Sequence, residues 1–326
     1  LLYPGLCFLE ATNLSEGRSS DFSFEAVGSP WLNATAVAQH INLFFGDELS
    51  SRPIHFIPNQ NKFAGEQCNG VHFMVNDPLQ FKPVFFGLFL IRIIKDLHPE
   101  KFEWVRDLFT DQESREVFNR VMEFRLNANL RAMRFFDYTA DQQYFEPFVK
   151  FSPGEVFVDG GGFDGYTTEE FIKRCPQYGG VHFFEPTETT LDNAKAKLSE
   201  HRDIHLHPVG LFDSKQTLSF DAGAGSACKI SETGSVKIEV DALDNRVTES
   251  VSFIKLDLEG AEPKALEGMK WHIQEDHPKL AVAVYHDPAH FWQVPEIILG
   301  VRNDYNVYLR HYTEGWTETV MFFIPK

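Results

Sequence analysis

The chain has 326 residues, a formal net charge of −17 at pH 7 and 43% hydrophobic residues. This length is roughly twice that of an ordinary domain, so we expect two domains. The acidic balance leaves no basic stripe for nucleic acid or for anionic membranes, and the composition excludes a disordered chain. We therefore expect a folded protein that binds neither nucleic acid nor membranes.

The first part of the chain, residues 1–104, consists of short β-rich and helical runs that are punctuated by prolines. We expect a smaller α+β domain here and a domain boundary near Glu103–Asp107. The longest apolar stretch of the chain, Val84–Ile94, is shorter than the about 20 residues that a membrane-spanning helix needs. It predicts a buried helix instead.

Four cysteines are scattered along the chain without C-x-x-C spacing, which predicts neither a zinc site nor a disulfide framework. No charged segment followed by an apolar one opens the chain, so no secretory signal is visible. These features favour a reducing, cytoplasmic location. Because the chain starts at Leu1 rather than at Met, we also expect it to be a fragment. The cysteines are Cys7, Cys68, Cys175 and Cys228.

Residues 105–150 predict a helical cover, since Asp111–Phe136 has helical spacing behind an acidic start. From Val156 onward, short apolar runs alternate with helical patterns, which predicts a doubly wound parallel sheet. The apolar runs are Val156–Val158, Val181–Phe184, Ile204–Val209, Phe253–Leu256 and Leu280–Val284. The helical patterns are Thr167–Arg174, Glu188–Glu200, Glu262–Gln274 and Phe291–Asn303.

The end of the chain predicts a different connection. Asn306–Tyr312 and Thr317–Ile324 are β-rich runs that are separated only by Thr313–Trp316. So short a turn joins antiparallel neighbours, so we expect the sheet to finish in a hairpin.

A glycine-rich loop, Gly160–Gly165, lies between the first strand of this sheet and the following helix. Such a loop lets a ligand approach bare backbone at a helix N-terminus, although a simple tight turn is the alternative. Counted from Asp159, the spacing is D-x-G-x-x-x-G, and the carboxylates of Asp159 and Asp164 would repel a diphosphate. A cofactor that carries an ammonium and a sulfonium would tolerate these carboxylates.

Further polar residues follow the other strands, and the carboxyl ends of parallel strands share one edge of the sheet. Glu185 is placed to accept hydrogen bonds from both hydroxyls of a ribose; a surface carboxylate is the alternative. Asp257 and Glu259 follow the next strand, and Tyr285 and His286 the one after.

His286 has the ordinary pKa of a base at neutral pH, although a packing or helix-capping role is the alternative. Its spacing to His290, with Asp287 between them, also suits a metal. Pro288 argues against a helical pair, so we expect no metal ligands there.

These residues lie in stretches that resemble the FkbM family of S-adenosylmethionine-dependent methyltransferases, over about residues 107–325. The resemblance implies a class I methyltransferase fold, which is a Rossmann-like sheet of seven strands with the last one antiparallel. It also implies S-adenosylmethionine as cofactor and O-methylation of a hydroxyl, often on a saccharide or a secondary metabolite; whether a divalent metal assists stays open. The matching stretches include VFVDGGGFDGYTTEEF, FFEPTETTLDNAK, FIKLDLEGAEPKALEGM and YNVYLRHYTEGWTETVMFFIP.

The resemblance also implies roles for single residues. Glu185 would hold the ribose, and Asp257, Glu259, Tyr285 and His286 would face the acceptor. The resemblance assigns no base; because the acceptor hydroxyl must lose a proton, we expect His286 or Asp257 to act as the catalytic base. A triple glycine where the family more often has one bulkier residue suggests a looser loop. The methionine end of the cofactor would contact Asp159, Gly161, Gly162, Phe163 and Gly165, the adenine Pro186 and Thr187, and a lid would be formed by Gln143, Tyr144 and Phe145.

Residues 1–104 resemble instead the C-terminal domain of the exo-β-N-acetylmuramidase family, which trims peptidoglycan sugars. The resemblance rests on stretches such as LLYPGLCFLEATNLSEGRSSDFSFEAVGSPW and KFAGEQCNGVHFMVNDP. It makes a peptidoglycan or glycan hydrolase, or a glycan-binding protein, the alternative function. The polar positions that match are Glu10, Asn13, Arg18 and Glu66, of which Glu10 and Arg18 have a simple ion pair across a loop as their alternative role.

Overall fold

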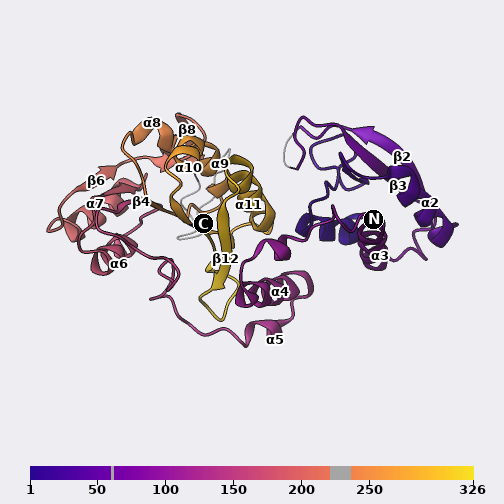
Figure 1. Ribbon diagram of the computed structural model, residues 1–326, viewed down its shortest axis with the longest axis horizontal. Helices are drawn as coiled ribbons and strands as arrows, with labels where there is room; N and C mark the ends of the chain where they lie inside the picture. Colours follow the sequence, from indigo (N-terminus) through magenta and orange to yellow (C-terminus); the bar gives the residue numbers. More distant parts are fainter. Residues whose placement is uncertain (60–61, 221–235) are drawn as a thin grey trace. The chain divides into compact units, whose positions relative to one another are not determined.

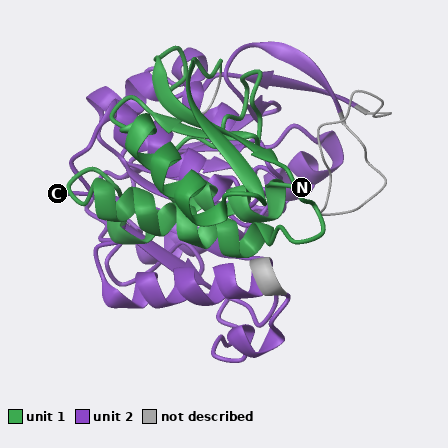
Figure 2. Ribbon diagram, turned by 90° about the vertical axis from the view of Figure 1, so that its right-hand side faces the viewer, with its two compact units in different colours: residues 1–108 green, residues 109–326 purple. Residues whose placement is uncertain are grey.

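The computed structural model describes residues 1–59, 62–220 and 236–326, so Cys228 lies outside the described residues. The chain divides into two compact units, Leu1–Leu108 and Phe109–Lys326, which Figure 2 colours separately. Among the described residues, Cys7, Cys68 and Cys175 are free thiols. The described ranges contain no helix with the length and apolar character needed to cross a bilayer.

Unit 1 is a small α+β unit with a three-stranded antiparallel sheet in the order β1-β3-β2. Its core is formed by the apolar faces of the sheet and of the two longer helices. In chain order the elements are α1 (Tyr3–Leu6), η1 (Cys7–Ala11), β1 (Ala26–Ser29), α2 (Ala34–Phe45), β2 (Leu49–Phe56), β3 (Cys68–Val75), α3 (Pro83–Leu97) and η2 (Val105–Leu108).

The helix α3 corrects one expectation, because it is amphipathic rather than buried throughout. Phe86, Leu90 and Ile94 repeat every four residues and are fully buried, as one face of a helix requires. Phe85 and Leu88 lie on the other side of α3, where about half of each side chain is exposed. An unbroken apolar run therefore does not by itself predict burial on all sides.

Unit 2 is built on the predicted seven-strand sheet, whose order is β12-β13-β11-β10-β4-β5-β6 (Figure 1). The neighbours from β11 through β6 are parallel, and β13 is antiparallel to both β11 and β12, so the C-terminal hairpin is confirmed. Its strands are β4 (Val156–Gly160), β5 (Gly180–Phe184), β6 (Ile204–His207), β10 (Phe253–Leu256), β11 (Lys279–Ala283), β12 (Tyr305–His311) and β13 (Thr319–Pro325).

The helices of unit 2 follow the strands in the predicted alternation. Figure 1 shows α9, α10 and α11 grouped together, away from α6 and α7. The helices are α4 (Gln112–Asn127), α5 (Leu130–Met133), α6 (Tyr166–Arg174), α7 (Glu188–Lys197), α8 (Leu243–Arg246), α9 (Glu262–Glu267), α10 (Lys270–Glu275) and α11 (His290–Val301).

Two features of unit 2 differ from the sequence prediction. The single helix expected over Glu262–Gln274 is broken at Gly268, where an added Cβ would lie 1.9 Å from the carbonyl oxygen of Phe212. A second sheet in the order β7-β9-β8 was not predicted, because its strands are short or rich in polar residues. These strands are β7 (Gly210–Leu211), β8 (Gln216–Phe220) and β9 (Val236–Asp241).

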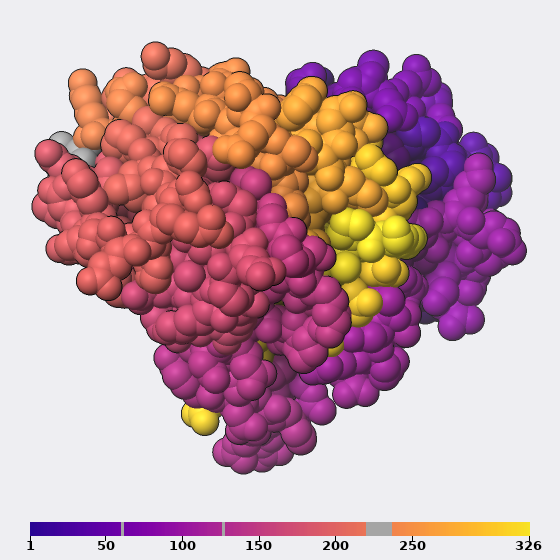
Figure 3. Space-filling view, turned by 60° about the vertical axis from the view of Figure 1, so that its left-hand side comes forward, coloured from indigo at the N-terminus to yellow at the C-terminus, as the bar shows by residue number. Residues whose placement is uncertain are grey.

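The segment that precedes the sheet, residues 109–151, packs on the C-terminal hairpin. Arg310 of β12 donates to Asp111 Oδ2 at 2.7 Å, and Ser114 Oγ of α4 accepts from the backbone N–H of Leu309 at 2.9 Å. In the space-filling view, magenta atoms of this segment lie against the yellow atoms of the hairpin (Figure 3). The segment is therefore an integral part of unit 2, and it reaches the edge of the sheet where the predicted site lies.

Candidate functional site

The glycine loop after β4 is tightly packed. A Cβ on Gly161, whose φ is +71°, would lie 2.0 Å from the carbonyl oxygen of Asp257. A Cβ on Gly162 would lie 2.1 Å from the ring of Phe183. The backbone N–H groups of both glycines donate to the carbonyl oxygen of Phe184 at 3.1 Å. The expectation of a looser loop is therefore wrong, since the glycines allow the turn to touch β5 and the end of β10.

Asp159 lies beneath this loop and does not reach its surface. The side chain is fully buried, and its two oxygens accept from Thr168 Oγ1 at 2.7 Å and from Lys255 Nζ at 3.1 Å. Lys255 also donates to the carbonyl oxygens of Gly160 and Gly161. Asp159 thus positions the loop through Lys255, which replaces the direct cofactor contact that the sequence predicted.

Sequence reasoning gave no role to Lys255. The available signal was a charged residue in the middle of a strand that is otherwise apolar, because a buried ammonium needs a partner. Asp164, the other carboxylate of the loop, also has a partner, since it forms an ion pair with Lys197 at 3.0 Å. The negative charge of the loop is thus largely compensated within the protein.

Glu185 ends β5 and faces the glycine loop. Burial raises the pKa of its carboxyl above the usual value, although the backbone N–H groups of Thr187 and Phe163 oppose that shift. Oε1 accepts from the Thr187 N–H at 2.9 Å, and Phe163 itself is exposed with a φ of +49°. Pro186 lies beside β7, because a Cβ on Gly210 would be 3.7 Å from its ring. Glu185 and the loop therefore share one side of the sheet edge.

The predicted lid lies over the end of β10. Tyr144 donates its hydroxyl to Asp257 Oδ2 at 2.6 Å, and Gln143 donates to Glu318 Oε2 at 2.6 Å and to the Tyr144 hydroxyl at 3.0 Å. Burial, followed by the charge of Asp257, raises the pKa of Tyr144 well above its usual value, so the phenol keeps its proton. This hydroxyl is consequently a donor at neutral pH.

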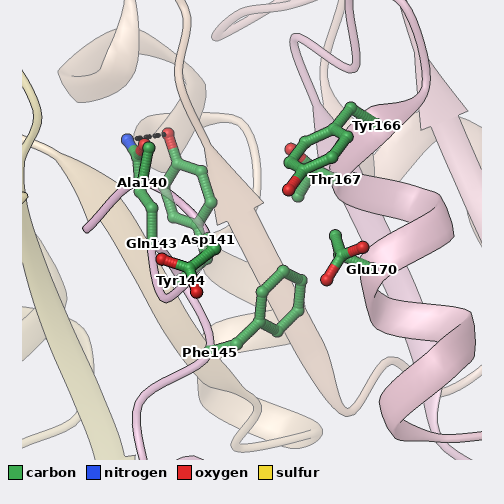
Figure 4. A pocket seen from close by; sticks show the side chains of 8 residues that line it. All are labelled: Ala140, Asp141, Gln143, Tyr144, Phe145, Tyr166, Thr167 and Glu170. Carbon is green, nitrogen blue, oxygen red and sulfur yellow. Dashed lines mark hydrogen bonds between the residues drawn. The ribbon is translucent and has the colours of Figure 1, made fainter. Parts of the chain in front are cut away.

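A small pocket lies between this segment and the first turns of α6. Figure 4 shows Gln143 and Tyr144 on one wall and Tyr166 and Thr167 on the other. The N-terminus of α6 immediately follows Gly165. The pocket therefore lies between the predicted lid and the helix that follows the glycine loop. Its lining residues are Ala140, Asp141, Gln143, Tyr144, Phe145, Tyr166, Thr167 and Glu170.

Asp257 is the centre of the polar cluster beyond the lid. In addition to Tyr144 it accepts from the Tyr285 hydroxyl at 3.2 Å, and its Oδ1 lies 3.4 Å from His286 Nε2. The same ring nitrogen lies 3.4 Å from Glu259 Oε2. The four residues that the sequence predicted for catalysis and acceptor binding are thus in direct contact.

The charge of His286 is set by these neighbours. Burial lowers the pKa of its ring, but the carboxylates of Glu259, Glu262 and Asp257 outweigh burial and raise the pKa to about 10. In this arrangement the ring already carries a proton at neutral pH, so it cannot take up the proton of an acceptor hydroxyl. Of the two predicted bases, Asp257 is therefore the one that can take up a proton, while its oxygens accept hydrogen bonds from Tyr144 and Tyr285.

Sequence reasoning missed two members of this cluster, Glu262 and Glu318, and it argued against a third, His290. Glu262 is fully buried at the start of α9. Its Oε1 lies 2.9 Å from His286 Nδ1, and its Oε2 lies 3.4 Å from His290 Nδ1. Glu318 is partly buried near Asp257, and this desolvation raises the pKa of its carboxyl. Glu262 follows the D-L-E-G motif at the start of a helix, which is the only sequence signal it gives.

The polar positions of unit 1 form a separate group. Arg18 pairs with Glu10 and, at 3.0 Å, with Glu16. Asn13 donates to the carbonyl oxygen of Lys101 at 2.7 Å and accepts from the Glu103 N–H at 3.0 Å, so it ties two distant segments together. Glu66 is exposed. Lys62, which the sequence analysis did not single out, is buried and donates to the carbonyl oxygens of three residues, Leu9, Glu10 and Leu14.

Comparison with protein families assigns the two halves of the chain differently. Residues 1–151 match the family described as "Exo-beta-N-acetylmuramidase NamZ, C-terminal", and residues 159–313 match the family described as "Methyltransferase FkbM domain". The first match extends beyond the predicted end at residue 104. It takes in residues 109–151, although these pack with unit 2 in the structure.

Individual relatives agree with this division. The peptidoglycan beta-N-acetylmuramidase NamZ of Bacillus subtilis is 36% identical over 104 residues, which are 32% of this chain and only 25% of that protein. The crystal structure of methyltransferase FkbM from Methylobacillus flagellatus has a TM-score of 0.60 and 23% identity, and the match covers 73% of this chain and 60% of that one. This likeness confirms the class I methyltransferase fold.

A third structure is similar only at a low level. Fibrillarin of Aeropyrum pernix, solved with natively bound S-adenosyl-L-methionine, has a TM-score of 0.36 and 9% identity over 57% of this chain and 71% of that one. The protein therefore joins a region similar to the C-terminal part of NamZ-type exo-β-N-acetylmuramidases to a region that matches the FkbM methyltransferase domain.

Proposed function

We propose that the protein is an S-adenosylmethionine-dependent methyltransferase that methylates a hydroxyl of a saccharide or of a secondary metabolite. The observation that carries the proposal is the placement of Glu185 beside the glycine loop, at the same sheet edge as the Asp257 cluster. Ligands of open α/β sheets bind at this edge. The match of residues 159–313 to a methyltransferase domain supports the same reaction class.

The residues at this edge suit the cofactor. Glu185 has a buried carboxylate at the end of the second strand, where an acidic side chain accepts the hydroxyls of an unphosphorylated ribose. Gly161, Gly162, Phe163 and Gly165 would border the methionine end. The unpaired excess of carboxylates around Asp257 favours a ligand with positive charge. When bound, the cofactor supplies an electrophilic methyl group.

The acceptor hydroxyl would lie against Asp257 and Tyr285, with Glu259 and His286 behind them. Asp257 would accept the proton that the acceptor hydroxyl loses when its oxygen takes the methyl group from the sulfonium sulfur, which would leave as a neutral thioether. Alignment of donor and acceptor contributes about 7–11 kcal/mol to such a reaction. The hydrogen bonds from Tyr144 and Tyr285 hold the carboxylate in place for this proton transfer.

Calorimetric titration with S-adenosylmethionine tests the proposal. We expect wild-type protein to bind with micromolar affinity and Glu185→Ala to weaken binding at least tenfold, which corresponds to about 1.4 kcal/mol. Glu200→Gln, an exposed change beyond α7, is the matched control and should bind like wild type. Absence of binding by folded wild-type protein would overturn the proposal.

A second candidate function rests on unit 1. The buried Lys62 and the Arg18 pairs hold Glu10 in a polar group at positions that resemble a glycan-active family. The chain spans only about a quarter of the curated relative, so hydrolysis by this part alone is the weaker proposal. Release of reducing sugar from muramyl substrates, abolished by Glu10→Gln, would support it.

A further inference from the structure

We propose that the carboxylates of Asp257 and Glu262 and the imidazole of His286 form a binding site for a divalent transition-metal ion. Each of these residues offers one ligand atom, and the three atoms lie within 4.8 Å of one another. The elements that supply them are the end of β10, the start of α9 and the end of β11. Three separate parts of the backbone thus converge on one point.

The spacing of the side-chain atoms suits a coordination sphere. Metal–ligand distances of about 2.1 Å place neighbouring ligands about 3.0 Å apart at right angles and about 3.4 Å apart at tetrahedral angles. One nitrogen of His286 would bind the ion in place of the proton that the ring otherwise carries: Nδ1 lies 2.9 Å from Glu262 Oε1, and Nε2 lies 3.4 Å from Asp257 Oδ1. Glu262 Oε2 and His290 Nδ1 are also 3.4 Å apart, so His290 extends the site.

The second observation is that several buried polar atoms of this cluster lack hydrogen bonds, although Glu262 Oε1 accepts from the Leu258 N–H at 2.7 Å. Glu262 and His290 are almost completely buried, and the side chain of His286 is only 9% exposed. Within the described residues, both ring nitrogens of His286, Nδ1 of His290 and Oε2 of Glu262 have no partner with hydrogen-bond geometry. An imidazolium that served only as counter-ion would direct its N–H bonds at the carboxylates. Buried polar atoms that lie close together without hydrogen bonds are typical of the ligands of a metal ion.

The donor set indicates the class of ion. Mg²⁺ and Ca²⁺ prefer spheres made of oxygen, whereas imidazole together with carboxylate suits first-row transition metals. The surroundings favour a cation, because Glu259 and Glu318 add further carboxylates around Asp257. We therefore expect Mn²⁺, Fe²⁺ or Zn²⁺ rather than a purely oxygen-seeking ion.

The position of the site suggests its use. Asp257 would share one oxygen with the ion while the other accepts from Tyr144, so the ion would lie next to the expected acceptor hydroxyl. A cation there orients that hydroxyl and makes it more acidic. This role rests on the proposed function, whereas binding of the ion does not.

Titration of the metal-free full chain with Mn²⁺, followed by calorimetry and by the electron paramagnetic resonance signal of free Mn²⁺, tests the inference. We expect one ion per chain, and at least tenfold weaker binding for Glu262→Gln and for Asp257→Asn. Glu267→Gln, an exposed change on the same helix, is the control and should leave affinity unchanged. Circular dichroism shows whether each variant is folded. If Glu262→Gln does not fold, the result for Asp257→Asn decides the outcome.

The inference is overturned if folded wild-type protein takes up no Mn²⁺ at millimolar concentration, or if the ligand variants and Glu267→Gln bind equally well. The same samples are titrated with S-adenosylmethionine. Binding of the cofactor without binding of Mn²⁺ would leave the proposed function intact and reject the metal site. Binding of Mn²⁺ without binding of the cofactor would reject the proposed function and support the site.

Discussion

Two buried charge clusters lie near the same edge of the large sheet, and they differ in how well their polar atoms are satisfied. Beneath the glycine loop, Asp159 accepts hydrogen bonds from Thr168 and Lys255. Lys255 also donates hydrogen bonds to two carbonyl oxygens of the loop. Beyond the lid, Glu262 and His286 are close together but retain buried atoms without hydrogen bonds. A cluster of the first kind is a scaffold, whereas one of the second kind is expected to accept a ligand.

Loss of the scaffold cluster should give the largest effect. Lys255→Met would leave Asp159 as an uncompensated buried charge, so we expect the free energy of unfolding to fall by about 3–5 kcal/mol. Urea denaturation measures this change. The double variant Asp159→Asn/Lys255→Met should recover part of the loss. Equal stabilities of Lys255→Met and wild type would show that the pair is not buried as described.

The lid contact should have a smaller effect. Tyr144→Phe removes a hydrogen bond to the charged Asp257, which is worth about 1.5–3 kcal/mol of unfolding free energy. Tyr138→Phe, on an exposed tyrosine of the same segment, is the control and should change nothing measurable. If the two variants were equally stable in urea, the lid would not be closed over Asp257 in solution.

His311 differs from His286 in that both of its ring nitrogens have hydrogen-bond partners. Its Nδ1 lies 2.8 Å from Thr319 Oγ1 and its Nε2 lies 2.9 Å from the Gly315 carbonyl oxygen. Burial lowers the pKa of His311 to about 4, although the backbone carbonyls oppose this shift. Because the unfolded chain binds the proton near pH 6.5, stability falls as the pH drops from 6.5 towards 4.

This histidine should therefore contribute about 2 kcal/mol to the loss of stability between pH 7 and pH 5. Urea denaturation at both pH values, on wild type and on His311→Gln, measures the contribution as a difference. We expect the variant to lose less stability on acidification than wild type. The same pH dependence in both proteins would contradict a neutral, buried His311.

The smallest effect is expected at the rim of the glycine loop. Asp164 and Lys197 form an ion pair whose side chains are 48% and 31% exposed, and such pairs contribute about 0–1 kcal/mol. Lys197→Met should therefore change stability by less than about 1 kcal/mol. Affinity for S-adenosylmethionine should also stay near that of wild type. A large loss of affinity would place Lys197 in the cofactor site.

The parts of the site that could be predicted from sequence depend on the regular alternation of strands and helices. Because parallel strands end at one edge, the sequence alone predicts that Glu185, Asp257 and His286 lie at the same edge of the sheet. The packing of side chains beneath that edge could not be predicted. Lys255 looked like one charge in an apolar strand, and Glu262 looked like an ordinary first residue of a helix.

Close backbone approaches were also beyond sequence reasoning. The pattern of Gly161 and Gly162 was read as room for a ligand, but their missing Cβ atoms make room for Asp257 and Phe183. Gly268 ends α9 for a similar reason, since Phe212 occupies the space that a side chain would need. Such contacts join residues far apart in the sequence, and periodicity carries no information about them.

Hydrogen exchange of the full chain with and without S-adenosylmethionine tests the central claim most directly. The account predicts slower exchange in peptides that cover Gly161–Gly165 and Glu185–Thr187, with residues 1–108 unchanged. Unchanged exchange in both loop peptides at a saturating concentration, or protection confined to residues 1–108, would contradict a cofactor site at the edge of the seven-strand sheet.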